Sequence, residues 1–491
     1  MNIFPSHQEA VRWGAMHRTS WSIVTLAALL LTVTALQAAH SPKTAAVIPL
    51  AVPWKQARVT PIVPAFASGR EIKGSDLATL FSGKTVDAAD GVVSVPIGSV
   101  PVVIESAKTP ADPDGFTGLS AGSPLGIHGI ENNFPENLAL LQDSGFPWVH
   151  LAGPSGLVWD LVEPSPGVYN WEHQDRLFRT FQQMGVKVCV VVLAANRWDQ
   201  GIAGPQRPKS RAPVHMEAYK KFLRAAVKRY SSVVACWQIE NEIDNPMSWE
   251  DTQPAYLALL SASYAVIKEN APDALVAFAG MSNPRSCKTV LLPMLKTYRK
   301  DNPQGTCFDI VDLHWSRQFQ GTYGALRIGD KSHRLDETLR DLRENLDALS
   351  FKKTPIWIAE MSDYTGKPAA DPIDGSYEEK SETEQAASLA KMSVLALANG
   401  ASRTFWIGLV DWYGWGGRGG GYFDHVGLAY NRMADPQGTK KMAYYSGKFL
   451  SHKLDGCTFE TAVPVSGSAN VRVYKFLRNG DAVYVAWRDP S

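Results

Sequence analysis

Two glutamates of this chain each follow directly on a short apolar run. Asn241 and Glu242 come after the run 233–239, and Glu360 comes after the run 355–359. Such runs are typical of parallel strands buried in a sheet, whose carboxyl ends lie at one rim. A lone Asn-Glu after a strand more often begins an acidic surface loop. The second glutamate, in the same position on another strand, makes chemistry the better interpretation.

Two carboxylates at one rim can flank a glycosidic bond. One must be held protonated so that it can donate to the leaving oxygen, and the other must be ionised so that it can attack the anomeric carbon. A neighbouring amide such as that of Asn241 can hold a sugar hydroxyl. No cluster of residues has metal-ligand spacing and no glycine-rich phosphate loop follows a strand. We therefore predict no metal and no other cofactor.

The elements that would position these groups alternate between strand and helix over residues 121–455. The expected strands are 125–128, 148–151, 186–193, 233–239, 275–279, 308–314, 355–359 and 403–407. Stretches with helical spacing lie between most of them, at 174–184, 216–230, 254–269 and 335–349. Eight strands alternating with helices predict an α/β fold, a (β/α)8 TIM barrel, in which active sites lie at the carboxyl ends of the strands.

The segments on both sides of the barrel have β character. Residues 41–120 and 456–491 contain five expected strands, at 91–98, 101–105, 459–465, 469–476 and 482–487. Neither segment has enough strands to cover a hydrophobic face alone. Because chain ends often lie close together, we predict that both segments join in one small β-sandwich, an accessory domain beside the barrel.

Residues 1–40 resemble a targeting segment rather than part of the fold. Arg12 and Arg18 precede the uncharged apolar stretch 21–39, which is typical of a secretory signal peptide and is also long enough for a single membrane anchor. Either alternative predicts an exported protein, periplasmic, anchored in the inner membrane, or secreted.

Composition gives weaker indications. The formal net charge of +1 gives no reason to expect nucleic acid as a partner, and we expect a monomer. Cys189 and Cys236 lie in strand-like runs and are expected to be small buried residues. Cys287 and Cys307 lie in neighbouring polar stretches and could form a disulfide in an oxidising compartment.

The rim residues resemble the signature of the retaining glycoside hydrolases of clan A, which carry Asn-Glu after strand four and Glu after strand seven. Asn241, Glu242 and Glu360 match it. The resemblance implies that Glu242 is the acid/base and Glu360 the nucleophile, and that His314 and Trp406 line the sugar site. Within the clan the sequence is most similar to family 39, particularly the PslG-like exopolysaccharide glycosidases of bacterial biofilm operons.

The chain departs from that pattern at two positions. Many clan members have an arginine at the end of strand two, where this chain has His150. Relatives often have a tyrosine two residues after the histidine of strand six, where it supports the nucleophile, and this chain has Ser316. Tyr323 and Tyr364 are candidates to replace that tyrosine.

Several other residues are expected to contact substrate. Aromatic side chains after barrel strands can stack on sugar rings, and Trp198, Trp315, Trp412 and Trp415 have such positions. His128 follows the first strand and is a further candidate for the site lining.

These features together predict a retaining β-glycosidase that acts within a polysaccharide, of an exopolysaccharide or biofilm system. One alternative is an exo-acting, xylosidase-like enzyme on oligosaccharides. Another is a carbohydrate-binding component of a polysaccharide export machine that lacks catalysis.

Overall fold

The structure is a computed structural model, and it describes residues 46–63, 72, 74–109, 116–130, 135–204, 206–315, 325–328, 331–370, 376–414 and 420–489. The predictions for residues 1–40 and for Ser316, Tyr323 and Trp415 lie outside these residues. Within the described ranges, no helix combines the length and the apolar composition that crossing a membrane requires.

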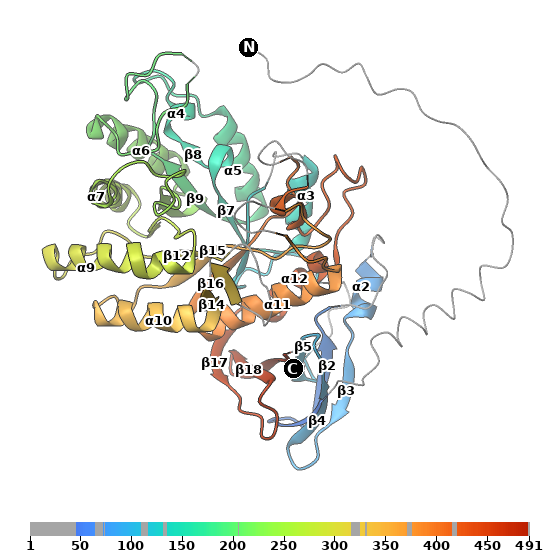
Figure 1. Ribbon diagram of the computed structural model, residues 1–491. Helices are drawn as coiled ribbons and strands as arrows, with labels where there is room; N and C mark the ends of the chain where they lie inside the picture. The colour runs from blue at the N-terminus through green and yellow to red at the C-terminus, as the bar shows by residue number, and fades with distance from the viewer. Residues whose placement is uncertain are drawn as a thin grey trace, which may run out of the picture. The chain divides into compact units, whose positions relative to one another are not determined.

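Eight parallel strands form the sheet at the centre of the molecule (Figure 1). In chain order they are β6 (Leu125–His128), β7 (Trp148–Leu151), β9 (Lys187–Leu193), β10 (Val234–Ile239), β11 (Leu275–Ala277), β12 (Val311–Trp315), β15 (Ile356–Met361) and β16 (Ala401–Ile407). Their spatial order is β11-β10-β9-β7-β6-β16-β15-β12, and the short β8 (Leu157–Val158) pairs with β9. Parallel bridges from Ala277 to Ile310 and from Met281 to Leu313 join the two edges. The predicted TIM barrel is confirmed.

Helices surround this barrel. They are α3 (Pro135–Ser144), α4 (Trp159–Val162), α5 (Glu172–Met184), α6 (Met216–Tyr230), α7 (Gln253–Asn270), α8 (Pro284–Ser286), α9 (Leu292–Asp301), α10 (Leu335–Ala348), α11 (Glu382–Ala398) and α12 (Met442–Lys453). Single turns labelled η2 (Gly153–Ser155), η3 (Cys287–Leu291) and η5 (Tyr422–His425) occur in the connections, and β13 (Ala325–Ile328) pairs with β14 (Lys331–Arg334).

Helix α6 is held by one apolar stripe, whereas α11 and α12 are buried on nearly all sides. Tyr219, Phe222, Leu223 and Ala226 recur at the spacing of one helical face and are all buried. The longer α11 begins at a capping box, in which Ser381 and Glu384 exchange hydrogen bonds with each other's backbone N–H groups.

Side chains from alternate strand positions fill the barrel interior near the amino ends of its strands. Trp148, Cys189, Cys236, Trp357 and Phe405 form one buried cluster there. Because strand side chains alternate between the two faces, residues two positions further along the same strands point into the barrel mouth. This spacing brings His150 of β7 and Gln238 of β10 to the mouth, where both are fully buried.

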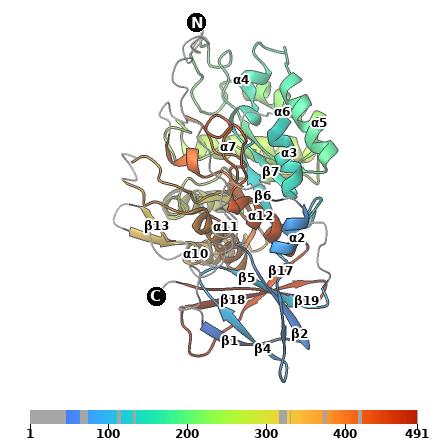
Figure 2. The same ribbon diagram turned by 90° about the vertical axis from the view of Figure 1, so that its right-hand side faces the viewer.

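The accessory domain contains strands from both sides of the barrel in the sequence (Figure 2). Its six-stranded antiparallel sheet has the order β17 (Thr458–Ala462), β18 (Val471–Arg478), β19 (Asp481–Arg488), β5 (Val102–Ser106), β2 (Gln56–Pro61) and β3 (Lys84–Asp87). The pair β1 (Ala46–Ala51) and β4 (Val92–Ile97) forms a second, small sheet, and α2 (Gly74–Leu80) follows β2. Register pairs such as Val483 with Glu105 join β19 to β5. The prediction that both ends build one β-sandwich is confirmed.

Alternate residues of β19 serve two different cores. Val483, Val485 and Trp487 belong to the same apolar cluster as the barrel helices. Tyr484 and Ala486 belong to a second cluster, which they share with the β1–β4 pair. The six-stranded sheet is therefore covered by the barrel on one face and by the small sheet on the other.

A buried ion pair lies where the sheet meets the barrel. Lys453, the last residue of α12, donates to the carboxylate of Glu105 in β5 at 2.7 Å, and the side chains are 6% and 1% exposed. Arg58 of β2 lies 3.6 Å from the same carboxylate. Because ionic groups lose hydration when buried, Glu105 depends on these partners.

Replacing Lys453 with methionine should destabilise the protein by about 3 kcal/mol, because it leaves a buried carboxylate with only the more distant Arg58. Urea unfolding measures the change. The matched control is Lys475→Met, since Lys475 pairs with Glu460 in the same sheet but at the surface and such pairs contribute about 1 kcal/mol or less. Equal losses in the two variants would contradict the prediction.

The predicted disulfide between Cys287 and Cys307 is wrong. All five cysteines are free thiols, and these two are buried in the main apolar core. Cys287 begins the turn η3 and Cys307 lies in the approach to β12. Their polar neighbours in sequence suggested exposed loops, but the thiols themselves point into the core. Cys189 and Cys236 are buried, as expected.

Candidate active site

The two glutamates expected from the sequence lie together at the carboxyl-end rim of the barrel. Glu242 follows β10, the fourth barrel strand, and Glu360 lies near the end of β15, the seventh. One carboxylate oxygen of each lies within 4.8 Å of the other, and a ring nitrogen of His314 lies within the same distance of both. An oxygen pair this close favours the short carboxyl separation of about 5–5.5 Å in double displacement over the 6.5–9.5 Å of single displacement.

The backbone turns sharply where β10 ends. Glu240 and Glu242 have φ angles of +61° and +46°, in the left-handed region that residues other than glycine rarely adopt. Two hydrogen bonds hold this turn, from the N–H of Glu240 to the carbonyl of Val192 and from the N–H of Glu242 to the carbonyl of Gly280. Neighbouring strands on both sides therefore hold the strained conformation that presents Glu242.

His314, on β12, bridges the two glutamates. Its Nδ1 lies 3.0 Å from Oε1 of Glu242 and 3.6 Å from Oε2 of Glu360, and its Nε2 lies 3.3 Å from the carboxylate of Asp312. Burial alone would lower the pKa of His314, but Glu360, Asp312 and Glu242 raise it well above its ordinary value. The histidine is therefore an imidazolium at neutral pH and supplies the positive charge between the carboxylates.

Glu360 is 8% exposed, and several charged groups surround its carboxylate. Burial raises its pKa to about 7, because the ionised form loses hydration, while the His314 cation opposes that rise and the charges of Glu242 and Asp312 add to it. A carboxyl with this pKa can change protonation state near neutral pH.

Gly280, after β11, leaves the space that His314 occupies. A Cβ added at this glycine would lie 2.0 Å from Nε2 of His314 and 2.6 Å from Oδ2 of Asp312. Both contacts are far inside van der Waals distance and involve fixed, buried groups. The close approach of backbone and imidazole therefore requires glycine.

The variant Gly280→Ala should displace His314 and separate it from Glu242. We expect kcat to fall by about 100-fold or more, the size of effect expected when charge stabilisation is lost, and stability to fall by about 1–3 kcal/mol from overpacking. Hydrolysis rates and thermal unfolding measure the two effects. The control is Gly98→Ala, between β4 and β5, where the Cβ position is open and φ lies outside the left-handed region, and a Gly280→Ala enzyme with wild-type kcat would contradict the expectation.

A second group of side chains lies on the opposite side of Glu360. Nε2 of His128, at the end of β6, lies 3.6 Å from Oε1 of Glu360. Nδ1 of His128 lies 2.6 Å from Nδ1 of His150, whose Nε2 lies 2.8 Å from Oε1 of Gln238. His128 was expected in the lining, and the structure places it against Glu360. Gln238 was not expected, although its position two residues before Glu240 on an apolar strand was a usable signal.

The fold, rather than the sequence, relates this chain to known proteins. The chain matches no protein-family model, and no curated protein matches its sequence. Among solved structures it is similar to a family 39 glycoside hydrolase from the gut symbiont Bacteroides cellulosilyticus WH2, with a TM-score of 0.59, 17% identity, and coverage of 90% of this chain and 87% of that chain. It is also similar to a glucosidase from Croceicoccus marinus, with a TM-score of 0.50, 14% identity, and coverage of 73% and 75%.

The chain has the fold of a family 39 glycoside hydrolase. The resemblance inferred from the rim residues is thereby confirmed for the fold. The roles of individual residues rest on the geometry of this chain.

Asn241 and Asn245 surround Glu242. Oδ1 of Asn241 accepts a hydrogen bond from Gln238 at 3.0 Å, so its NH2 group is left to donate elsewhere, as a residue that holds a sugar hydroxyl must. Asn245 donates to Oε2 of Glu242 at 3.1 Å. The sequence does not indicate this contact, because it depends on the backbone turn at residue 242.

Two of the expected aromatic contacts are wrong. Trp315 is fully buried in the main core, because His314 points into the barrel and the next residue of a strand must point to the helices. Trp406 is 3% exposed and lies in the same core, with its indole N–H donating to the carbonyl of Val426. His314 is also fully buried and contacts the two glutamates, so it supports them instead of lining the cleft.

Two tryptophans keep partial exposure. Trp198 packs edge-on against Trp159 and donates its N–H to the carbonyl of Glu163. Trp412 stacks on Phe423 with ring centroids 4.7 Å apart and planes 20° apart. Both remain candidates for substrate contact, and the Trp412–Phe423 stack offers the broader aromatic surface.

Tyr364 does not replace the missing tyrosine beside the nucleophile. Its hydroxyl donates to the carbonyl of Glu378, away from Glu360. The nearby Asp363 is buried and paired with Lys380 at 2.7 Å. The groups in contact with Glu360 are therefore the histidines on β6 and β12, which sequence reasoning had not connected with it.

Two groups of three side chains at this rim have donor atoms close enough together for a metal ion: His128, His150 and Glu360, and Glu242, His314 and Glu360. Their nitrogens already contact one another, Gln238 or carboxylates. The prediction that no metal is used stays a prediction.

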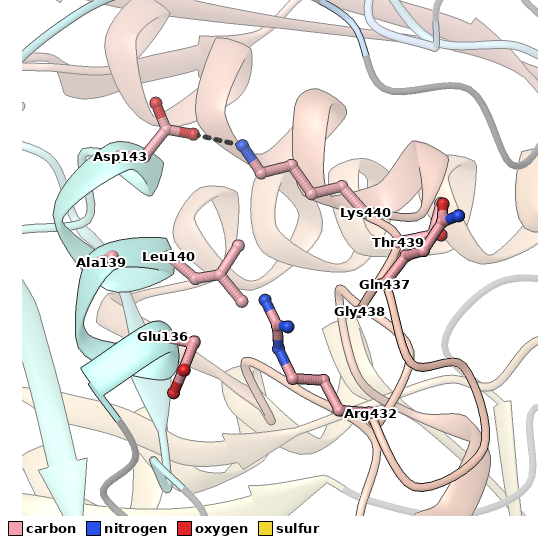
Figure 3. A pocket seen from close by; sticks show the side chains of 9 residues that line it. All are labelled: Glu136, Ala139, Leu140, Asp143, Arg432, Gln437, Gly438, Thr439 and Lys440. Carbon is pink, nitrogen blue, oxygen red and sulfur yellow. Dashed lines mark hydrogen bonds and ion pairs between the residues drawn. The ribbon is translucent and has the colours of Figure 1, made fainter.

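A cavity of about 400 Å³ lies away from the glutamates, between α3 and residues 432–440 (Figure 3). Asp143 on its wall accepts hydrogen bonds from Lys440, Tyr444 and Lys448. Burial would raise the pKa of Asp143, but these hydrogen bonds hold it well below its ordinary value. The charges along this wall thus hold α12 against α3, and the cavity contains none of the rim residues.

Proposed function

We propose that this protein is an exported retaining β-glycosidase that cleaves within a polysaccharide, in particular an exopolysaccharide. The observation that carries the proposal is the pair Glu242 and Glu360 on the fourth and seventh strands, with oxygens within 4.8 Å of each other across His314. The fold shared with a family 39 glycoside hydrolase supports it.

The reaction would have two steps. Glu360, ionised, attacks the anomeric carbon, and the bond to the leaving oxygen breaks as Glu242 donates its proton to that oxygen. Glu242, now a carboxylate, then removes a proton from water, which displaces Glu360 and restores both groups. Two displacements at one carbon return the original configuration.

His314 would serve both steps. As an imidazolium it lies 3.0 Å from Glu242 and 3.6 Å from Glu360, so it favours whichever carboxyl carries negative charge. In the first step that charge moves from Glu360 to Glu242, and the fixed cation faces both positions. Preorganised charge of this kind needs no rearrangement during reaction.

The substrate is assigned by its chemical class. The amide of Asn241 beside the acid/base suits a ring hydroxyl, and Trp412 and Trp198 offer aromatic faces at the rim for further sugar rings. These partly exposed rings favour a chain of several sugars over a single one.

The test is a panel of bacterial exopolysaccharides and of xylan-, mannan- and glucan-type polymers and oligomers, with product size and anomeric configuration followed by chromatography and proton NMR. We expect mid-length oligosaccharides that first appear with the β configuration. Release of single sugars from the chain end would show that the enzyme is exo-acting and not endo-acting. Binding of a polymer without turnover, or initial α products, would overturn the catalytic proposal.

Export is proposed from residues 1–40 alone. Expression of the full chain followed by cell fractionation should place the protein outside the cytoplasm, and amino-terminal sequencing should show whether the segment is removed. A protein confined to the cytoplasm would overturn this part of the proposal and leave the glycosidase assignment in place.

A further inference from the structure

The hydrogen bonds beside Glu360 fix where each proton lies. Nε2 of Gln238 is 3.2 Å from the backbone carbonyl of Glu240. Because a carbonyl can only accept, this atom must be the NH2 nitrogen, and the other amide atom of Gln238 must be the oxygen. That oxygen lies 2.8 Å from Nε2 of His150, which must therefore carry a proton.

The assignment continues through the two imidazoles. Burial lowers the pKa of His150 to about 4, so the ring is neutral and its Nδ1 has a lone pair. Nδ1 of His128 lies 2.6 Å from that lone pair and must donate to it. Burial and the nearby His150 and His314 lower the pKa of His128 well below its ordinary value. In a neutral His128 the remaining nitrogen, Nε2, is then an acceptor.

That acceptor faces Glu360. Nε2 of His128 and Oε1 of Glu360 are 3.6 Å apart, slightly beyond the 2.7–3.2 Å of a hydrogen bond. A lone pair beside an ionised carboxylate would be repulsive, so the two atoms favour one shared proton, which passes between them when they approach to hydrogen-bond distance. His128 is 4% exposed, and His150 and Gln238 are fully buried, so water has little access to this chain of groups.

We propose that His128 is a positioning residue for Glu360 and accepts the proton that Glu360 must lose before it attacks, with His150 and Gln238 fixing the tautomer that makes this possible. The O–H bond of Glu360 breaks and an N–H bond forms at Nε2 of His128. The products are a carboxylate and an imidazolium side by side. The inference rests on the proposed function and adds the route by which the nucleophile becomes ionised.

The surroundings of His128 suit a transfer within the pair. It faces His150 from β7, Glu360 from β15 and, at longer range, the His314 cation from β12. His314 disfavours a second cation nearby, and the carboxylate of Glu360 favours one. The imidazolium of His128 is therefore stable only while Glu360 is ionised, which couples the two protonation states.

The tautomers can be tested without any substrate. In protein labelled with 15N-histidine at neutral pH, we expect His150 to carry its proton on Nε2 and His128 on Nδ1. As the pH is varied around 7, Nε2 of His128 should gain partial proton character in the wild type. In Glu360→Gln, which has no proton to give, it should stay a lone-pair nitrogen. A His128 protonated on Nε2 alone, or a His150 protonated on Nδ1, would overturn the proposal.

Kinetics give the second test. In His128→Asn the amide takes the place of Nδ1 and can still donate to His150, but no basic nitrogen faces Glu360. We expect kcat to fall by about 100-fold with little change in KM. The acid limb of kcat/KM should move up by about one pH unit, since Glu360 can no longer ionise by giving its proton to His128. The control is His173→Asn, on the outer helix α5.

The outcomes separate the two proposals. If no polymer or aryl glycoside is hydrolysed, the proposed function fails and the 15N assignments still decide the proton positions. If hydrolysis is found but the acid limb of His128→Asn stays in place or moves to lower pH, the role of His128 is overturned. The position of the limb does not depend on the amount of folded enzyme, so partial misfolding of the variant leaves the test valid.

Discussion

Glu360→Gln should reduce hydrolysis by a factor on the order of 10⁶, the loss seen when a hydrolase loses its nucleophile. The amide has the shape of the carboxyl but cannot form the glycosyl ester on which the two-step reaction depends. The measurement is kcat on the polymer that the panel identifies and on its aryl glycoside. Removing a buried group whose pKa is raised by burial should leave stability equal or higher, since the amide needs no ionic partner.

Chemical rescue makes this prediction sharper. In Glu360→Gly the space of the side chain is open, and azide can attack the anomeric carbon from the face that Glu360 occupied. The product should be the α-glycosyl azide, because one displacement inverts the carbon. The control is Glu217→Gln, on α6 with a side chain 81% exposed. A Glu360→Gln enzyme with more than a few per cent of wild-type activity would show that another residue is the nucleophile.

Glu242→Gln should give a loss that depends on the leaving group. For a polymer, whose leaving alcohol needs a proton, kcat should fall by about 10²–10⁴-fold, the usual contribution of general acid catalysis. For a dinitrophenyl glycoside the first step needs no acid and should stay fast. The second step lacks its base, so the glycosyl enzyme should accumulate and appear as a burst.

Azide distinguishes the two glutamates here as well. It needs no general base, so it should accelerate turnover of Glu242→Gln and yield the β-glycosyl azide, opposite in configuration to the product of the Glu360 variant. Mass spectrometry of the trapped enzyme should locate the sugar on Glu360. The same configuration of azide from both variants would refute the division of roles.

Much of this arrangement can be predicted from the sequence because it depends on alternation along the chain. Apolar runs at regular intervals indicate the barrel, and a polar residue that ends such a run must lie at the rim. That reasoning locates Glu242 and Glu360 and brings them together without knowledge of any contact. It also finds β5, β17, β18 and β19 of the accessory sheet, since runs too few to fold alone must find partners elsewhere, but it does not find β2 or β3.

What the sequence could not supply are contacts between strands. Three different strands, β6, β7 and β10, carry His128, His150 and Gln238. Which of these side chains donates to which depends on distances near 3 Å between the strands, and the spacing of residues along the chain does not determine such distances. The need for glycine at Gly280 follows only from the position of His314 on the adjacent strand. These details rest on the register of the parallel strands, which is set by packing over the whole barrel.

The two wrong tryptophan predictions have a common physical cause. Trp315 and Trp406 lie at the ends of barrel strands, and position along the chain alone does not indicate exposure. A strand has two faces, and at the barrel rim one face meets the cleft while the other meets the helices. The parity of Trp315 relative to His314 was available from the sequence and would have predicted its burial.

The pairing of β5 with β19 has a consequence for how the protein is made. The entire barrel separates these strands along the chain, yet their hydrogen bonds connect the two halves of one sheet. During synthesis the edge of β5 stays unpaired until β19 has left the ribosome. The sheet can therefore be completed only after the barrel has been translated. Contacts so distant in sequence slow folding, and the open edge is a site for incorrect pairing. Folding yield should therefore depend on what covers β5 in the interval.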